Sequence, residues 1–218
     1  MQIESLKILG FSEATLTMIL DILETNNFFP KIEIINNLNI SPTKNYLRDT
    51  FDLNFTSITD LNKRDLFILG VTKTKTKISL LNYFKNIDSK SFLNLISKSS
   101  NISSATKFGQ GIIINNMVCI AGHSTIGDFV FINRGVTIGH HTIIGDFTTI
   151  NPGTNIAGNV IVGKNCQIGM GVNIFDGVTI GDNVTIGAGS LVTKNIPNNV
   201  VAYGNPCKII RENETQSI

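Results

Sequence analysis

Residues 126–150 read IGDFVFINRGVTIGHHTIIGDFTTI and place a large apolar residue at every sixth position. An α-helix repeats its apolar residues every three or four positions and a strand every two, so a period of six matches neither element alone. It predicts a coil with a turn in every repeat. The same period runs without interruption through sixteen positions: Ile102, Phe108, Ile114, Ile120, Ile126, Ile132, Ile138, Ile144, Ile150, Ile156, Val162, Ile168, Ile174, Ile180, Ile186 and Val192.

Two further positions of the repeat are also restricted. The residue after the apolar one is usually Gly, which suits a corner that needs unusual backbone angles or a close approach of two chains. Three hexads form one triangular coil of 18 residues, and coils stack at about 4.8 Å, the spacing of parallel strands. The sequence therefore predicts a parallel β-helix of about five coils. The fourth residue after each apolar one is small or β-branched and is expected to point inward: Ser124, Val130, Val136, Thr142, Thr148, Thr154, Val160, Cys166, Val172, Val178, Val184 and Ser190.

The first 98 residues have a different pattern, in which apolar strands alternate with amphipathic helices. Such alternation favours a small parallel α/β sheet. We therefore predict an α/β domain over residues 1–98 and the β-helix with its tail over residues 99–218, linked by Phe92–Ser103. The predicted strands are Leu6–Gly10, Lys31–Ile35 and Leu66–Val71, and the predicted helices are Glu13–Glu24 and Lys77–Ile87.

Composition narrows the classes of function. Of 218 residues, 42% are hydrophobic and 16% are charged, as in a globular protein with a substantial core. A net charge of +2 with scattered basic residues gives no footprint for nucleic acid or for an anionic membrane. The N-terminal stretch lacks signal-peptide features, and no uncharged apolar run reaches the roughly 18 residues of a membrane span. We expect a soluble cytoplasmic protein whose cysteines, Cys119, Cys166 and Cys207, are reduced thiols because no C-x-x-C spacing is present.

The three histidines of the chain, His123, His140 and His141, all fall in the β-helix. His123 and His141 are one coil apart, so they should occupy the same column on adjacent coils. Because Ile138 points inward, Gly139, His140 and His141 should form an exposed turn. A histidine there is either a solvated corner residue or a general base, since imidazole titrates near neutral pH.

The segment from Ile138 to Asn213 resembles the hexapeptide acyltransferases that use acetyl-CoA. It is most similar to the group that modifies bacterial surface sugars, which comprises sialic acid O-acetyltransferases and nucleotide-linked 4-amino-sugar N-acetyltransferases. Its ending, Tyr203-Gly-Asn-Pro-Cys-Lys-Ile-Ile-Arg211, is similar to the family tail G-x-P-A-K-x-x-R, with Cys207 in place of Ala. The resemblance covers nearly the whole chain. It implies a small Rossmann-like N-terminal domain before a left-handed parallel β-helix.

The resemblance also implies roles for single residues. His140 matches the catalytic histidine, and His141 stands where the group usually has Asp or Glu to orient it. Asn133 falls at a position that contacts the acceptor in the group, although an Asn at a solenoid corner is equally often a turn residue. Gly10 and Ser12 remain from a loop, G-x-G-G-H or G-x-S-G-H, that receives the sugar nucleotide, whereas Glu13 and Ala14 replace its second Gly and His. The remaining matches are to the acetyl-CoA site: Thr149 where some members have a second histidine, Gly158 and Ala188 along the pantetheine, Met170 packed on the same arm, and Lys208 and Arg211 near the phosphates.

The implied activity is acetyl transfer from acetyl-CoA to an amino group of a sugar, expected to be nucleotide-linked, in bacterial surface-glycan biosynthesis. The same resemblance leaves open O-acetylation of a sialic acid. It implies a homotrimer with each site between neighbouring β-helices, and no metal. Two other classes remain as alternatives: a zinc enzyme like the γ-carbonic anhydrases, because neutral imidazoles suit Zn²⁺, and a non-catalytic β-helix used for assembly.

Overall fold

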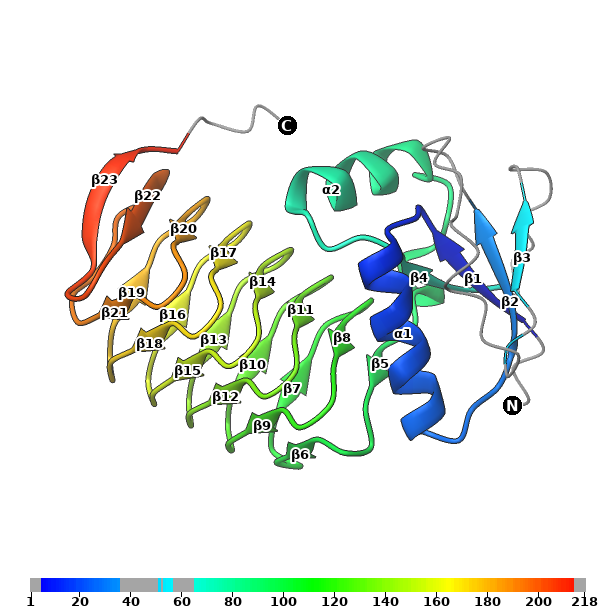
Figure 1. Cartoon of the computed structure of the whole chain (residues 1–218), viewed down its shortest axis with the longest axis horizontal. Helices are drawn as coiled ribbons and strands as arrows, with labels where there is room; N and C mark the ends of the chain where they lie inside the picture. The colour runs from blue at the N-terminus through cyan, green and yellow to red at the C-terminus, as the bar shows by residue number, and fades with distance from the viewer. Residues whose placement is uncertain (1–4, 36–50, 52, 57–64, 214–218) are drawn as a thin grey trace.

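The structure is a computed structural model that describes residues 5–35, 51, 53–56 and 65–213. A small α/β sheet lies at one end of a long parallel β-helix, and a C-terminal hairpin lies at the other end (Figure 1). Within the described ranges, no helix is both long enough and apolar enough to cross a membrane. The arrangement of an α/β sheet followed by a parallel β-helix confirms the predicted fold class.

The N-terminal sheet is four-stranded and parallel, in the order β3-β2-β1-β4. This order matches the first four strands of the Rossmann order 3-2-1-4-5-6, which agrees with the predicted class. The strand β3, which follows an Asn-rich stretch, was not predicted from the sequence. The strands are β1 (Ser5–Leu9), β2 (Lys31–Ile35), β3 (Leu53–Thr56) and β4 (Leu66–Leu69).

The helix α1 (Glu13–Thr25) lies between this sheet and the β-helix (Figure 1). Its buried apolar residues form one cluster with the sheet and with Leu95, Ile113 and Phe131, whose side chains point outward from the β-helix. A hydrogen bond from Asn26 Nδ2 to the carbonyl of Ile96 fixes the end of the helix. The helix α1 therefore joins the sheet to the outer surface of face I in one apolar cluster, which is separate from the interior of the β-helix.

The helix α2 (Thr74–Tyr83) begins and ends earlier than the predicted helix Lys77–Ile87. Its buried residues are Thr74, Lys77 and Leu80, spaced three apart, so a lysine occupies a central position of the docking face. The sequence pattern places the start of such a helix too late, because Thr and Lys are taken as exposed residues and are not counted toward a buried face. A short 3-10 helix, η2 (Ser89–Ser91), follows, with Asp88 accepting a hydrogen bond from its backbone.

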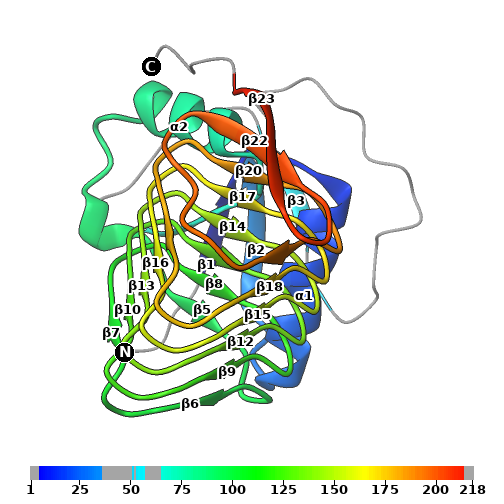
Figure 2. The same ribbon diagram turned by 90° about the vertical axis from the view of Figure 1, so that its left-hand side faces the viewer.

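The β-helix has three flat faces, visible where its coils stack behind one another in Figure 2. Face I packs against the N-terminal domain, and the chain then passes through face II and face III in every coil. Face I contains β5 (Leu95–Ile96), β8 (Ile113–Ile114), β11 (Phe131–Ile132), β14 (Thr149–Ile150), β17 (Gln167–Ile168), β20 (Thr185–Ile186), β22 (Val200–Tyr203) and β23 (Lys208–Glu212). Face II contains β6 (Asn101–Ile102), β9 (Cys119–Ile120), β12 (Thr137–Ile138), β15 (Asn155–Ile156), β18 (Asn173–Ile174) and β21 (Leu191–Val192). Face III contains β7 (Lys107–Phe108), β10 (Thr125–Ile126), β13 (Ile143–Ile144), β16 (Ile161–Val162) and β19 (Thr179–Ile180).

The interior of the β-helix confirms both predicted inward columns. The sixth-position ladder is buried from Ile114 to Val192, and only Ile102 and Phe108 in the first coil are partly exposed. The second column is buried throughout, and its hydroxyl groups find backbone acceptors. Thr148 and Thr154 each donate to a carbonyl of the next coil at 2.8 Å, so these buried polar groups are satisfied.

The glycines of the repeat are explained by close approach and not by unusual backbone angles. A Cβ added to Gly139 would lie 2.4 Å from the carbonyl carbon of Ala157 in the next coil. The left-handed backbone falls two positions later in the corner, for example at Phe129, His141 and Phe147. Each corner therefore stacks tightly at its first residue and turns at its third.

The two ends of the β-helix differ in what adjoins them. The segment Phe92–Ser103, expected to be a linker, contains β5 and β6, and β5 already pairs with β8 on face I. At the other end β22 pairs with β20, and β23 folds back antiparallel on β22. The hairpin therefore covers the face I edge of the last coil, and the N-terminal domain packs beside the first strand of face I.

Candidate active site

The corner between faces II and III carries His140 and His141. Ile138 is buried just before them, while both imidazoles are exposed, as predicted. The backbone is fixed in the stack, because His141 N–H donates to the carbonyl of Gly122 and Asn159 N–H donates to that of His140. The corner therefore presents two imidazoles to solvent on a rigid frame.

The two imidazoles contact each other through the same ring atom. Nδ1 of His140 lies 3.1 Å from Nδ1 of His141, so one ring donates and the other accepts. When His140 donates, its Nε2 carries a free lone pair and can accept a proton. The neighbouring residue thus orients His140 through one hydrogen bond.

His123 lies one coil below His141, and their rings stack with centroids 5.0 Å apart at 25°. This confirms that the two residues share a column. Nowhere in the described part of the chain do three His, Cys, Asp or Glu side chains form a group that could hold a metal ion. The three histidines therefore form a stacked pair, His123 and His141, with His140 hydrogen-bonded to His141.

Gly158 lies in the coil directly above His140. A Cβ at this position would come within 2.6 Å of Cε1 and 2.8 Å of Nε2 of His140, so only glycine leaves the ring its position. The structure therefore brings together two of the predicted site residues, His140 and Gly158. The backbone of Gly158, which carries no side chain, lies beside Nε2 of His140.

Asn133 lies at a different corner, between faces I and II. Its side chain is buried, and its Oδ1 accepts from the backbone N–H of Arg134 at 2.8 Å and from Asn115 Nδ2 at 3.4 Å. Both contacts belong to a ladder of asparagines that closes successive turns. The geometry favours the turn role for Asn133 over contact with an acceptor.

Met170 and Ala188 also lie at the corner between faces I and II, one coil apart, and Met170 is exposed. Lys208 and Arg211 are exposed on β23, which covers the last coil. In one chain these residues do not share a corner with His140. Three strand pairings separate the coil of His140 from the last coil of face II, about 14 Å at the spacing of parallel strands.

Thr149 lies on face I beneath the N-terminal domain and is 2% exposed. Its hydroxyl donates to the carbonyl of Thr72 at 2.8 Å and accepts from Lys77 Nζ at 3.1 Å. This corrects the expectation that Thr149 contacts acetyl-CoA. The hydroxyl is buried, and it already donates one hydrogen bond and accepts another within the domain interface.

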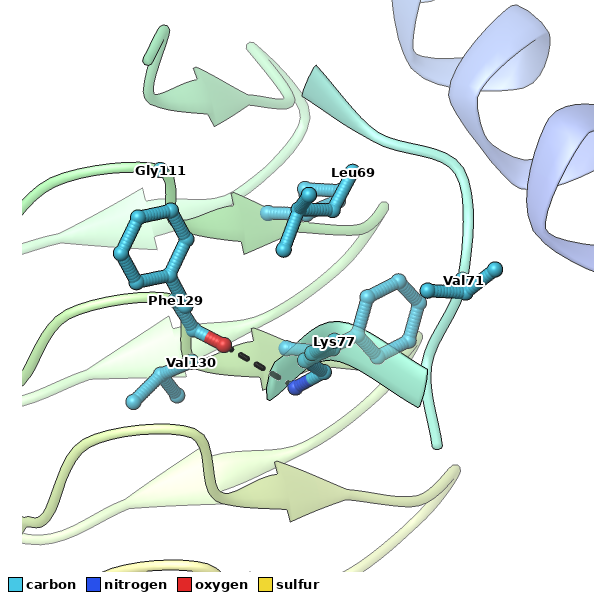
Figure 3. A pocket seen from close by; sticks show the side chains of 8 residues that line it. Leu69, Val71, Lys77, Gly111, Phe129 and Val130 are labelled. Atoms are coloured by element: carbon cyan, nitrogen blue, oxygen red, sulfur yellow. Dashed lines mark hydrogen bonds between the residues drawn. The ribbon is translucent and has the colours of Figure 1, made fainter. Parts of the chain in front are cut away.

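Lys77 is the residue of this interface that sequence reasoning missed. Its ammonium also donates to the carbonyls of Phe129 at 2.9 Å and Phe147 at 3.3 Å, beside a small cavity lined by Leu69 and Val71 (Figure 3). Burial lowers the pKa of Lys77 to about 7, because loss of water penalises the charged form. The sequence did contain a signal for its burial, because Lys77 lies on the same face of α2 as the other buried residues, Thr74 and Leu80.

Gly10 and Ser12 lie at the carboxyl end of β1, next to β4. In open α/β sheets this point, where the strand order reverses, is the usual ligand crevice. Gly10 has φ of +77°, and an added Cβ would lie 2.6 Å from Leu80 Cδ1. Ser12 precedes α1 as its N-cap without a capping hydrogen bond from its side chain.

A second missed residue is Asp176, which stands in the column of His140 and Gly158, two coils above the histidine. Its Oδ1 lies 3.0 Å from the point where a Gly158 Cβ would be. The 18-residue arithmetic that paired His123 with His141 also relates His140 to Asp176, so the signal was present in the sequence.

Comparison with known proteins identifies the repeat. The family described as "Bacterial transferase hexapeptide (six repeats)" matches residues 123–158, 141–176 and 159–194. Comparison with curated protein sequences gives no significant match.

Several solved structures share the fold over nearly the whole chain. One is a mutant perosamine N-acetyltransferase from Caulobacter crescentus in complex with CoA and GDP-perosamine, with a TM-score of 0.80, 22% identity, and coverage of 97% of this chain and 99% of that one. Another is the acetyltransferase domain of PglB from Neisseria gonorrhoeae in complex with acetyl coenzyme A, with a TM-score of 0.82, 20% identity, and coverage of 96% and 100%. WeeI from Acinetobacter baumannii has a TM-score of 0.81, 21% identity, and coverage of 94% and 99%. Residues 123–194 are therefore bacterial transferase hexapeptide repeats, and the chain has the left-handed β-helix fold of these proteins with an N-terminal α/β domain.

Proposed function

We propose that this protein is an acetyl-CoA-dependent acetyltransferase that acetylates an amino group of a nucleotide-linked amino sugar in bacterial surface-glycan biosynthesis. The observation that carries the proposal is the exposed imidazole of His140, whose Nδ1 is held by His141 while Nε2 faces the bare backbone of Gly158. Solved proteins of the same fold bind CoA together with GDP-perosamine, or acetyl coenzyme A.

In the proposed reaction, Nε2 of His140 removes a proton from the acceptor nitrogen, which attacks the thioester carbonyl of acetyl-CoA. The carbon–sulfur bond breaks, and CoA leaves as the thiol. A positioned general base contributes typically 10²- to 10⁴-fold to such a step. The reaction needs neither a metal ion nor a covalent enzyme intermediate.

The acetyl-CoA site extends, in this proposal, from His140 toward the exposed cations Lys208 and Arg211 on β23. Arg and Lys suit the phosphates of an anionic ligand. Met170 and Ala188 lie at another corner of the same chain, so a second copy is needed to bring them to His140. We therefore propose a homotrimer with each site in the cleft between neighbouring β-helices, located in the cytoplasm.

The direct test is acetyl transfer. The purified protein is incubated with acetyl-CoA and a panel of nucleotide-linked amino sugars and sialic acids, and CoA release is followed by a thiol assay. We expect release with a nucleotide amino sugar, and a loss of at least about 100-fold in turnover for His140→Ala.

Two outcomes contradict the proposal. Release only with sialic acids would indicate an O-acetyltransferase. Absence of any thermal stabilisation by saturating acetyl-CoA would indicate a non-catalytic β-helix, because a ligand that prefers the native state must raise its melting temperature.

A further inference from the structure

His140 and Asp176 approach the backbone of Gly158 from opposite sides. They can do so because Gly158 has no side chain: a Cβ there would lie 2.8 Å from Nε2 of His140 and 3.0 Å from Oδ1 of Asp176. A base and a carboxylate therefore converge on one point of bare backbone. The regular 18-residue repeat, which places all three residues in one column, fixes this arrangement.

The carboxylate of Asp176 is held by the coil that carries Gly158. Asn159 Nδ2 lies 3.4 Å from Oδ1 of Asp176, and Gly177 N–H donates to the carbonyl of Gly158 at 3.0 Å. Across the described ranges Asp176 forms no ion pair with a lysine or arginine. The charge of the carboxylate is therefore available to a ligand that binds beside His140.

We propose that Asp176 binds the amino group of the acceptor as its ammonium ion, beside Nε2 of His140, and thereby selects an amine over a hydroxyl as the group to be acetylated. This inference rests on the proposed function and specifies the acceptor chemistry of the same site. Asp176 would be an acceptor-binding residue that determines specificity.

The chemistry of an alkyl amine explains why a carboxylate is useful at this point. The amine is mostly an ammonium ion in neutral water, and it must lose one proton before its nitrogen can attack. Asp176 attracts the ammonium, and Nε2 of His140 takes the proton and becomes an imidazolium that the same carboxylate stabilises.

The rest of the reaction balances without another reactant. The free amine forms the nitrogen–carbon bond, the carbon–sulfur bond breaks, and the second proton of the nitrogen passes to the CoA thiolate. The proton on His140 then leaves to solvent. A hydroxyl acceptor is neutral throughout binding, so the charge of Asp176 gives it no comparable attraction.

The test compares Asp176→Asn with the wild-type protein, because Asn keeps the size and the hydrogen bonds of Asp but removes the charge. Kinetics are measured with a nucleotide-linked amino sugar and with the same nucleotide sugar carrying a hydroxyl in place of the amine. For Asp176→Asn we expect KM for the amine to rise about tenfold, the loss of one charge-assisted hydrogen bond, while kcat/KM for the hydroxyl compound stays within about twofold.

Two further variants serve as controls. Asp176→Glu retains the charge and should keep KM for the amine within about threefold of wild type. Asp182→Asn makes the same charge change at another corner, where Oδ1 accepts from the backbone N–H of Lys164 at 2.7 Å. This variant should leave the kinetics with the amine and with the hydroxyl compound unchanged.

The outcomes separate the two claims. A wild-type protein that acetylates the amine, together with an unchanged KM for Asp176→Asn, would overturn the role of Asp176 and leave the proposed function intact. A wild-type protein that transfers acetyl to neither compound would overturn both.

Discussion

Nδ1 of His140 and Nδ1 of His141 are 3.1 Å apart and share one hydrogen. Either ring can be the donor, but only donation by His140 leaves its Nε2 free to act as a base. Protonation of His141 has the opposite effect, because an imidazolium has no acceptor and would force His140 to accept. The contact therefore orients the base while allowing a tautomer that cannot accept a proton at Nε2.

Replacing His141 should show the cost of this ambiguity. His141 has a left-handed backbone, φ of +57°, which Gly, Asn and Asp tolerate best. We expect His141→Gly to lower kcat about tenfold through loss of one orienting hydrogen bond. His141→Asp should recover or exceed wild-type kcat, because a carboxylate can only accept. Steady-state kinetics at saturating acetyl-CoA measure this, and an equal loss in both variants would contradict the orienting role.

Gly158→Ala should reduce turnover by about tenfold or more without unfolding the protein. The added methyl group would lie 2.6 Å from the ring of His140 and would displace it. Gly122→Ala is the matched control, since it lies one coil below His140 in the same column and its Cβ would meet only Ser103, at 3.3 Å or more. Comparable losses of kcat in both variants would show that the effect is not specific to the site.

The buried lysine predicts how stability depends on pH. The pKa of Lys77 is lowered to about 7 in the folded protein from 10.5, so above pH 7 the unfolded chain binds more protons than the folded one. The free energy of unfolding should therefore rise as pH increases from about 7 to 8.5. Burial raises the pKa of Cys166 to about 11, and this opposes the trend only above about pH 9.

Lys77→Met should abolish this rise, as measured by urea unfolding across the same pH range. The exposed Lys75 on the same helix offers the control, and Lys75→Met should retain the wild-type slope. A wild-type free energy of unfolding that falls between pH 7 and 8.5 would contradict the assignment.

Lys208→Ala and Arg211→Ala should each weaken binding of acetyl-CoA severalfold, as measured by calorimetry, because both cations are exposed on β23. The effect should shrink as salt rises, since exposed charges are screened. Lys90→Ala, in η2, should have no effect. Equal binding at low salt by wild type and by both variants would exclude the tail from the cofactor site.

The sequence determines the β-helix more fully than the N-terminal domain. An inward column of Ile and Val with a second column of Thr, Ser and Val leaves one packing solution, so the interior was predictable residue by residue. The same register correctly predicted that His123 lies one coil below His141 and that the turn containing His140 is exposed. In the N-terminal domain, short strands and Asn-rich stretches carry weaker patterns, and β3 was missed.

The site was harder to predict where it depends on contacts between columns or domains. Thr149 reads as an outward residue of the solenoid, and nothing in its own hexad indicates that Thr72 and Lys77 cover it. Asp176 reads as one acidic corner residue among several until it is placed two coils above His140. Tertiary neighbours, not local patterns, decide where both side chains lie.

The placement of α1 between the sheet and face I limits how this protein can be rearranged. Because α1 packs against both the sheet and outward side chains of face I, the N-terminal domain is not an exchangeable module. A chimera that joins it to another solenoid would have to carry over Leu95, Ile113 and Phe131 as well. Diversification of the acceptor in such a protein is therefore constrained to loops and corner residues, and wholesale exchange of the domain is disfavoured.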